Sequence, residues 1–142
     1  MTVPFDLESF VHAAGDAIIA AAPDGSIVLW NPAAQRIFGY TEEEALGRPL
    51  DLIIPERYRE RHWEGYRQVM SSGQTRYGAN VLRVPAAHKD GRALSIAFTV
   101  ALVSSQKGSI EAIVATVRDE TERWQEERAL RKRIAELEAG HK

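Results

Sequence analysis

Residues 16–31, with the sequence DAIIAAAPDGSIVLWN, decide the fold because they predict a β-hairpin that leads directly into a helix. The apolar run of residues 17–22 ends in a Pro-Asp-Gly turn at residues 23–25, and the β-rich run of residues 26–30 follows at once. Glycine in an Asp-Gly turn supplies the positive φ that the turn requires. Two apolar runs joined in this way indicate a pair of antiparallel strands.

Two short helices are predicted next in the chain. Asn31 can cap a helix that has Pro32 in its first turn, where a missing N–H has no cost, and Gly39 ends this helix. Thr41 lies three residues before Glu44, which is the spacing of a capping box, so it begins the second helix.

A longer helix is predicted from Pro55 to Ser72, with Gly73 as its stop. Its apolar and aromatic side chains recur at spacings of three and four residues and therefore share one side of the helix. These are Tyr58, His62, Tyr66, Val69 and Met70. We expect the imidazole of His62 to face the interior, whereas His88 is expected to lie in solvent because it belongs to a turn.

Three further strands are expected over residues 77–84, 93–103 and 110–117, where apolar residues alternate between turn signals. Together with the first hairpin they make five strands. The long connection between the second and third strands carries the short helices, so the sheet should be antiparallel with the helices on one face. The predicted fold class is α+β.

The chain changes character at residue 119. We expect residues 1–15 to form a helical lead-in, residues 16–118 the core, and residues 119–142 a charged C-terminal helix. A helix this polar does not fold alone, so we expect it to pair with another copy as a short coiled coil; the alternative is a solvated, frayed helix. Its regularly spaced large apolar residues are Leu130, Ile134 and Leu137.

Composition limits the classes of function. The 142 residues include 18 basic and 20 acidic residues, and this balance argues against a dedicated nucleic-acid or membrane-surface protein. The sequence has no cysteine, which excludes disulfides, thiolate metal sites, thiol catalysis and any chromophore attached through sulfur. With neither a signal peptide nor a catalytic motif in the sequence, we expect a cytoplasmic protein that is not an enzyme.

Several segments, in their order and spacing, resemble the PAS sensory domain family over residues 8–125. The resemblance implies a PAS fold, in which a five-stranded antiparallel sheet and short helices enclose a cavity for a small ligand or cofactor. It also implies a signalling helix after Asp119 and Thr121. The matching segments are the opening hairpin, NPAAQRIFGYTEEEALGRPL (31–50), IPERYRERHWEGY (54–66), HKDG (88–91) and VRDETER (117–123).

The function implied by the resemblance is that of a signal-transduction module. Such a module binds a small ligand or cofactor in its core and relays the change, through dimerisation and the C-terminal helix, to a partner protein or output domain. One alternative is a haem-based oxygen sensor, and another is a purely structural dimerisation domain.

His62 is the main candidate binding residue. A neutral imidazole on an apolar wall is a good axial donor to haem iron. The segment IPERYRERH is also similar to the one that supplies the proximal histidine in the haem-binding oxygen-sensor PAS domain of enteric phosphodiesterases, and His62 falls on that position. Tyr58 and Tyr66 are expected to line the same site, and Asn80, or Arg83 if it faces inward, can hydrogen-bond bound dioxygen.

Other occupants of the cavity stay open. Rhizobial oxygen-sensor kinases place their iron-binding histidine at the end of this element, where this sequence has Thr75 and Arg76 instead. In the alternative to haem binding, His62 is a buried histidine that forms a hydrogen bond with a carbonyl group. The remaining alternatives are an empty pocket, a non-covalent redox flavin stacked on Trp30 or Trp63, and a small acid bound by Arg57, Arg59 and Arg61.

Overall fold

The computed structural model describes residues 2–75 and 80–140. The strands are β1 (Ala17–Ala21), β2 (Ile27–Trp30), β3 (Leu82–Ala87), β4 (Ala93–Ser104) and β5 (Ile110–Asp119). The helices are α1 (Leu7–Ala13), α2 (Pro32–Phe38), α3 (Glu42–Ala45), the 3-10 helix η1 (Leu50–Ile53), α4 (Glu56–Ser72) and α5 (Thr121–Ala139). In this part of the chain, no helix has the length and apolar character needed to cross a lipid bilayer.

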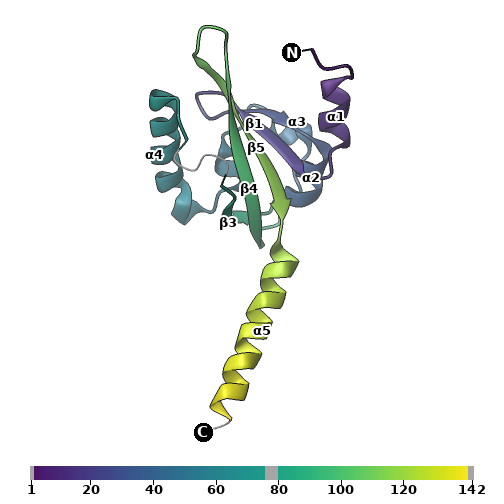
Figure 1. Ribbon diagram of the computed structural model, residues 1–142, viewed down its shortest axis with the longest axis vertical. Coiled ribbons are helices and arrows are strands. Elements are labelled where there is room, and N and C mark those ends of the chain that lie inside the picture. Colours follow the sequence, from purple (N-terminus) through teal and green to yellow (C-terminus); the bar gives the residue numbers. More distant parts are fainter. Residues whose placement is uncertain (1, 76–79, 141–142) are drawn as a thin grey trace.

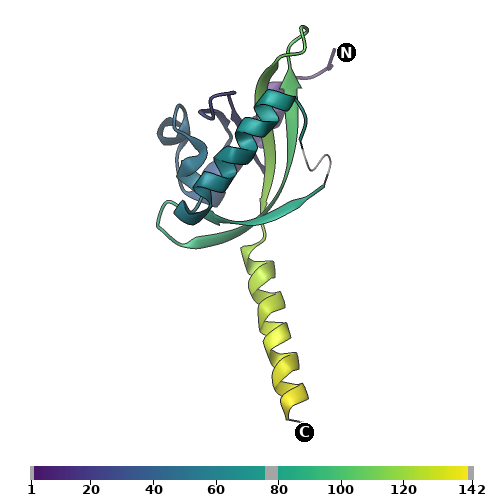
Figure 2. The same cartoon turned by 90° about the vertical axis from the view of Figure 1, so that its left-hand side faces the viewer.

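The strands form one antiparallel sheet in the order β2-β1-β5-β4-β3. The helices α2, α3 and α4 lie on one side of this sheet, and α5 extends away from the end of β5 (Figures 1 and 2). The α+β class and the five-stranded antiparallel sheet expected from the sequence are confirmed.

The apolar core lies between the sheet and the helices α2, α3 and η1. Trp30, at the end of β2, is 2% exposed, and its ring centroid lies 5.7 Å from that of the fully buried Phe38. The indole N–H of Trp30 donates a hydrogen bond of 2.9 Å to the backbone oxygen of Tyr40. The first hairpin and the first helix after it therefore pack against each other, as their adjacency in the sequence suggests.

Asn31, which is 4% exposed, connects three parts of this core through its side chain. Its Oδ1 accepts hydrogen bonds from the backbone N–H of Ala34, which caps α2, and from that of Ile18 in β1, at 3.1 and 2.9 Å. Its Nδ2 donates to the backbone oxygens of Val11 and Asp16, at 2.9 and 3.1 Å. One amide thus joins α1, β1 and α2, and the sequence pattern predicted only the cap.

The third strand differs from the sequence prediction. It was expected over residues 77–84, but β3 runs from Leu82 to Ala87, and residues 76–79 lie outside the described part of the chain. The strand continues through Pro85, which has no N–H to donate. An edge strand tolerates proline because one of its sides has no neighbouring strand, and β3 is paired only with β4.

His88 is also placed differently from the prediction, since its side chain is only 13% exposed. It lies on Gly39, where an added Cβ would be 2.6 Å from Cε1 of the imidazole. The neighbouring Lys89 N–H donates a hydrogen bond of 2.9 Å to the backbone oxygen of Phe38. The expectation of a solvated His88 is therefore wrong, because the turn between β3 and β4 is docked on the end of α2.

We predict that Asn31→Ala lowers the free energy of unfolding by about 3 kcal/mol, because it removes a helix cap and leaves buried backbone groups unpaired. Urea unfolding followed by circular dichroism measures this loss. Gln35→Ala, an exposed change in the same helix, serves as the control and should have little effect. A loss below about 1 kcal/mol for Asn31→Ala would show that the four hydrogen bonds are readily replaced by water.

Candidate functional site

The long helix α4 is attached to the rest of the molecule by a few directional contacts. The indole N–H of Trp63 donates a hydrogen bond of 2.6 Å to Oδ1 of Asp51 in η1. The hydroxyl of Tyr66 donates to the backbone oxygen of Ala22, just after β1. The Trp63 ring also covers Gly25, where an added Cβ would lie 2.3 Å from the ring. These contacts hold α4 against η1 and against the turn between β1 and β2.

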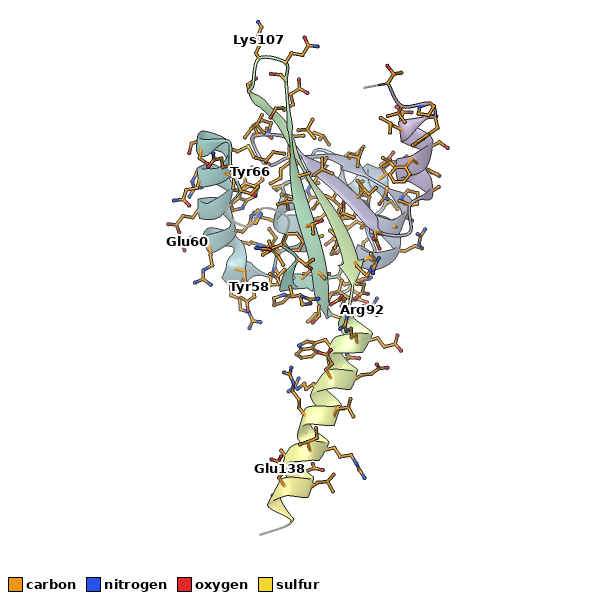
Figure 3. All side chains as sticks on the ribbon, viewed as in Figure 1. Tyr58, Glu60, Tyr66, Arg92, Lys107 and Glu138 are labelled. Atoms are coloured by element: carbon orange, nitrogen blue, oxygen red, sulfur yellow. The ribbon has the colours of Figure 1, made fainter. Side chains whose placement is uncertain are left out.

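α4 contributes little to the apolar core. None of its side chains belongs to the main cluster of buried apolar residues, and Tyr66 is the only residue of this helix that is buried. Figure 3 shows Tyr66 on the side of α4 that faces the sheet and Glu60 on the opposite side. Burial, with a smaller contribution from the Asp24 carboxylate, raises the pKa of Tyr66 to about 12. Its hydroxyl therefore stays protonated and remains a donor.

His62 lies on the inward side of α4 and packs against two other rings. Its ring centroid is 4.7 Å from that of Trp63 and 5.7 Å from that of Tyr66. Its Nδ1 is buried and has no hydrogen-bond partner among the described residues. Burial lowers the pKa of His62, and the nearby Asp51 carboxylate opposes this shift. A neutral imidazole of this kind can donate or accept a hydrogen bond, or ligate a metal ion.

The inner face of the sheet is fully covered by the core at one end and only partly covered at the other. Leu94 and Ile96 on β4 are buried in the core, as is Val117 on β5. Farther along both strands, apolar side chains of the same face are only half-buried: Phe98, Val100, Leu102 and Ile113. α4 therefore lies beside an apolar wall that it covers only in part (Figure 2).

Two open surface hollows lie on the described part of the chain. One, of about 390 Å³, lies between the C-terminal end of α4 (residues 70–73), Pro23 and the turn between β4 and β5. The other, of about 410 Å³, is lined by charged residues where β5 passes into α5. Neither is lined by His62, so neither corresponds to a closed core cavity beside that residue.

The structure does not bring the other two predicted polar residues to His62. Asn80 is exposed. The Arg83 side chain is 63% exposed, and its Nε lies 3.4 Å from Oε2 of Glu120. Arg83 pairs across the sheet with Ala97, beside the inward-facing Ile96. It therefore points to the face of the sheet opposite the core.

The predicted cluster of arginines on α4 is also occupied by local contacts. The Arg57 guanidinium lies 4.8 Å from the centroid of the Tyr58 ring, and Tyr58 itself is half-buried. Arg59 donates a hydrogen bond of 2.9 Å to the backbone oxygen of Ile54. These two residues are engaged with their own neighbours, which disfavours a joint clamp on a small acid.

The first turn of α5 is fixed to the start of β4. The Ser95 N–H donates a hydrogen bond of 3.0 Å to Oγ1 of Thr121, and the Ser95 carbonyl accepts one of 2.8 Å from the N–H of Glu120. The Asp119 carboxylate accepts hydrogen bonds from both the N–H and the hydroxyl of Thr121. Asp119 and Thr121, which the sequence singled out, therefore lie together at the link between strand and helix.

Glu120 takes part in the same junction, although no sequence pattern selected it. Its side chain is 17% exposed, with Oε2 beside Arg83 of β3 and Oε1 3.8 Å from Nη1 of Arg123 in α5. No local spacing marks this residue, because Arg83 is 37 positions away in the chain. Asp51, which holds Trp63, was missed for the same reason.

Residues 6–119 match the protein family described as PAS fold. The chain is 35% identical over 116 residues to an uncharacterized protein of Azorhizobium caulinodans, an alignment that covers 81% of this chain and 16% of that protein. It is 30% identical over 135 residues to Sensor protein FixL of Bradyrhizobium diazoefficiens, covering 92% and 26% of the two chains. It is also 30% identical over 80 residues to Oxygen sensor protein DosP of Escherichia coli, covering 56% and 10%. The chain thus spans only 10–26% of the length of these relatives.

Solved structures share this fold. A PAS domain of a protein from Colwellia psychrerythraea superimposes with a TM-score of 0.70 at 20% identity, covering 81% of this chain and 94% of that one. An RNA-binding light-oxygen-voltage receptor superimposes with a TM-score of 0.70 at 24% identity, covering 91% and 36%. At these identities the likeness establishes the fold alone.

The pKa of His62 predicts a pH-dependent stability. Because its pKa is lower in the folded chain than in the unfolded chain, the unfolded state takes up the proton more readily. The contribution of neutral His62 to the free energy of unfolding should be fully present above about pH 6.5, and it should be lost as the pH falls toward the lower pKa of the folded state. Urea unfolding at a series of pH values, compared with His62→Leu, isolates this contribution because the other histidines are common to both proteins. If the difference in free energy of unfolding between the two proteins does not change with pH, the pKa of His62 is not lowered by folding.

Proposed function

Since the chain belongs to the PAS family, we propose that it is a sensor module that binds a small ligand between α4 and the inner face of the sheet and transmits the change to α5. The observation that carries the proposal is the buried Nδ1 of His62, which has no hydrogen-bond partner in the described part of the chain and lies beside the incompletely covered apolar wall. A buried polar atom without a partner costs about 1–3 kcal/mol, and a ligand that bonds to it removes this cost.

The attachment of α4 supports entry of a ligand at this place. The helix is held by the Trp63 and Tyr66 hydrogen bonds and by the contact with Gly25, not by membership of the core. Displacing it therefore exposes less apolar surface than displacing a core helix does. A ligand with an apolar body and one polar or metal group suits the wall and the imidazole.

Haem b is the more specific form of this proposal, with His62 as axial donor. Burial keeps the imidazole neutral, which suits iron ligation, and two relatives are named as a sensor protein and an oxygen sensor protein. Haem iron needs only one or two protein donors, so the lack of a cluster of three or more ligating side chains among the described residues does not conflict with it. A non-covalent flavin is less favoured, because Trp30 is packed in the core and Trp63 is bound to Asp51.

The junction between β4 and α5 supports the second half of the proposal. Both backbone groups of Ser95 are bonded to the start of α5, and the next residue, Ile96, is part of the core. Glu120 adds a link from α5 to β3 through Arg83. A ligand that favours one of two positions of these strands would therefore change the position of α5. The proposed role is binding and signalling without a reaction of its own, acting on an output domain or a partner protein.

We predict that hemin added to the purified chain produces a Soret band, and that His62→Ala abolishes it because the axial donor is lost. His12→Ala, which changes an exposed histidine, is the matched control and should bind as the original chain does. Equal spectra for the chain with and without His62 exclude the haem form. Native mass spectrometry of the freshly purified chain tests for any other bound ligand, and a chain that binds nothing in either experiment is instead a structural domain.

We predict that Glu120→Gln weakens the junction between β4 and α5. The exchange of the Ser95 and Glu120 amide protons, measured by NMR, reports on the two hydrogen bonds directly and should become about two- to fivefold faster. Arg83→Gln removes one of the two ion pairs of Glu120 and should give a smaller change in the same direction, and the double variant should add little to Glu120→Gln, because that change already removes the pair with Arg83. Glu122→Gln, an exposed change in the same turn, is the control, and equal exchange in Glu120→Gln and Glu122→Gln would overturn this role.

A further inference from the structure

One of the two surface hollows lies at the open end of the apolar wall but does not reach His62. This hollow, of about 390 Å³, is lined by residues 70–73 at the C-terminal end of α4 and by residues 108–110 of the sheet, among others. Ile110 lies three residues nearer the turn between β4 and β5 than Ile113, which belongs to the wall. The hollow is therefore a direct approach to the wall from the outside.

Tyr66 stands between this hollow and His62. The residues His62, Tyr66 and Met70 follow one another at intervals of four along α4, so they share one side of the helix. The ring centroids of His62 and Tyr66 are 5.7 Å apart, and Met70, on the other side of Tyr66, lines the hollow. Tyr66 itself is 7% exposed. Its ring thus separates the hollow from the imidazole.

The hydrogen bond of Tyr66 closes the passage from α4 to the sheet. Its hydroxyl donates to the backbone oxygen of Ala22. Ala22 comes directly after Ala21, which pairs with Ile113 in the sheet, and directly before Pro23, which lines the hollow. The phenol side chain therefore crosses from the helix to the sheet at the boundary between the hollow and the wall.

The C-terminal end of α4 is held less firmly than its middle. Its inward residues Val69 and Met70 are only half-buried. The hydroxyls of Ser71 and Ser72 donate to backbone oxygens three and two residues away, so these bonds stay within the segment. Trp63, by contrast, is bonded to another element. Outward movement of the last turn of α4 therefore exposes little apolar surface.

We infer that Tyr66 is the gate of the proposed ligand site. A ligand enters through the hollow and reaches His62 when the Tyr66 hydroxyl leaves the Ala22 oxygen and the last turn of α4 moves outward. The inference rests on the proposed function, because it concerns access to the same site. It assigns Tyr66 a role in the rate of entry, which is separate from the role of His62 in holding a ligand.

The labelling rate of His62 by diethyl pyrocarbonate, which modifies neutral imidazole, tests the gate. We expect Tyr66→Phe in the full chain to raise this rate about two- to tenfold, because the ring stays and one hydrogen bond is lost. Tyr58→Phe makes the same change at the half-buried Tyr58 on the far side of His62, and it should leave the rate unchanged. His88, whose side chain is 13% exposed, is the internal reference for general loosening. Equal labelling of His62 in the two variants, or an equal rise at His88, overturns the inference.

Crosslinking across the hollow tests the route, since the chain has no cysteine of its own. Ser71→Cys and Ser109→Cys together place one thiol on each side of the hollow. A flexible bismaleimide that joins them should slow the labelling of His62, both in the otherwise unchanged chain and with Tyr66→Phe. The same two cysteines capped separately with N-ethylmaleimide are the control. Equal labelling rates in the crosslinked and capped proteins contradict entry through the hollow.

Neither readout requires a bound ligand. A chain that fails to bind hemin or any other ligand, but shows the expected labelling, retains the gate and loses the proposed function. A chain that binds hemin through His62, but is labelled equally in Tyr66→Phe and Tyr58→Phe, retains the binding site and loses the gate. The two failures are therefore told apart.

Discussion

The sheet presents more apolar inner surface than its short helices cover. The helices α2, α3 and η1 close the half that contains Leu94, Ile96 and Val117. The other half depends on α4, which contributes no residue to the main core. Because α4 packs less closely than the other helices, the apolar face beside it stays partly exposed. The proposed binding site depends on this partly exposed face.

Directional polar contacts, not apolar packing, position the elements at the border of the core. The Asn31 amide joins α1, β1 and α2, the Trp63 indole joins α4 to η1, and Thr121 joins α5 to β4. A hydrogen bond fixes orientation but contributes only about 0.5–1.5 kcal/mol to stability, far less than burial of a large apolar helix face. Elements held in this way keep a defined position and still move at modest cost, which is what a sensor requires.

Residue patterns located the centre of the candidate site but not its surroundings. The three- and four-residue spacing on α4 correctly placed His62 and Tyr66 inward, because a helix repeats every 3.6 residues. The same kind of local reasoning was wrong for His88, and it left the side of Arg83 undecided. His88 is covered because its turn docks on Gly39, and Arg83 points outward because it pairs with Ala97 in the sheet. Both outcomes depend on segments that are distant in the sequence.

The sequence by itself determined the strands of the first hairpin, the caps at Asn31 and Thr41, the long helix and the antiparallel α+β class. These follow from periodicity and turn chemistry, which act over a few neighbouring residues. Only the tertiary structure decided that Trp63 donates a hydrogen bond to Asp51 while its ring covers Gly25. The same holds for the ion pair between Glu120 and Arg83, and for the hydrogen bonds by which the Asn31 amide joins α1, β1 and α2. These contacts depend on how separate elements are brought together in space, and no short-range pattern in the chain records that arrangement.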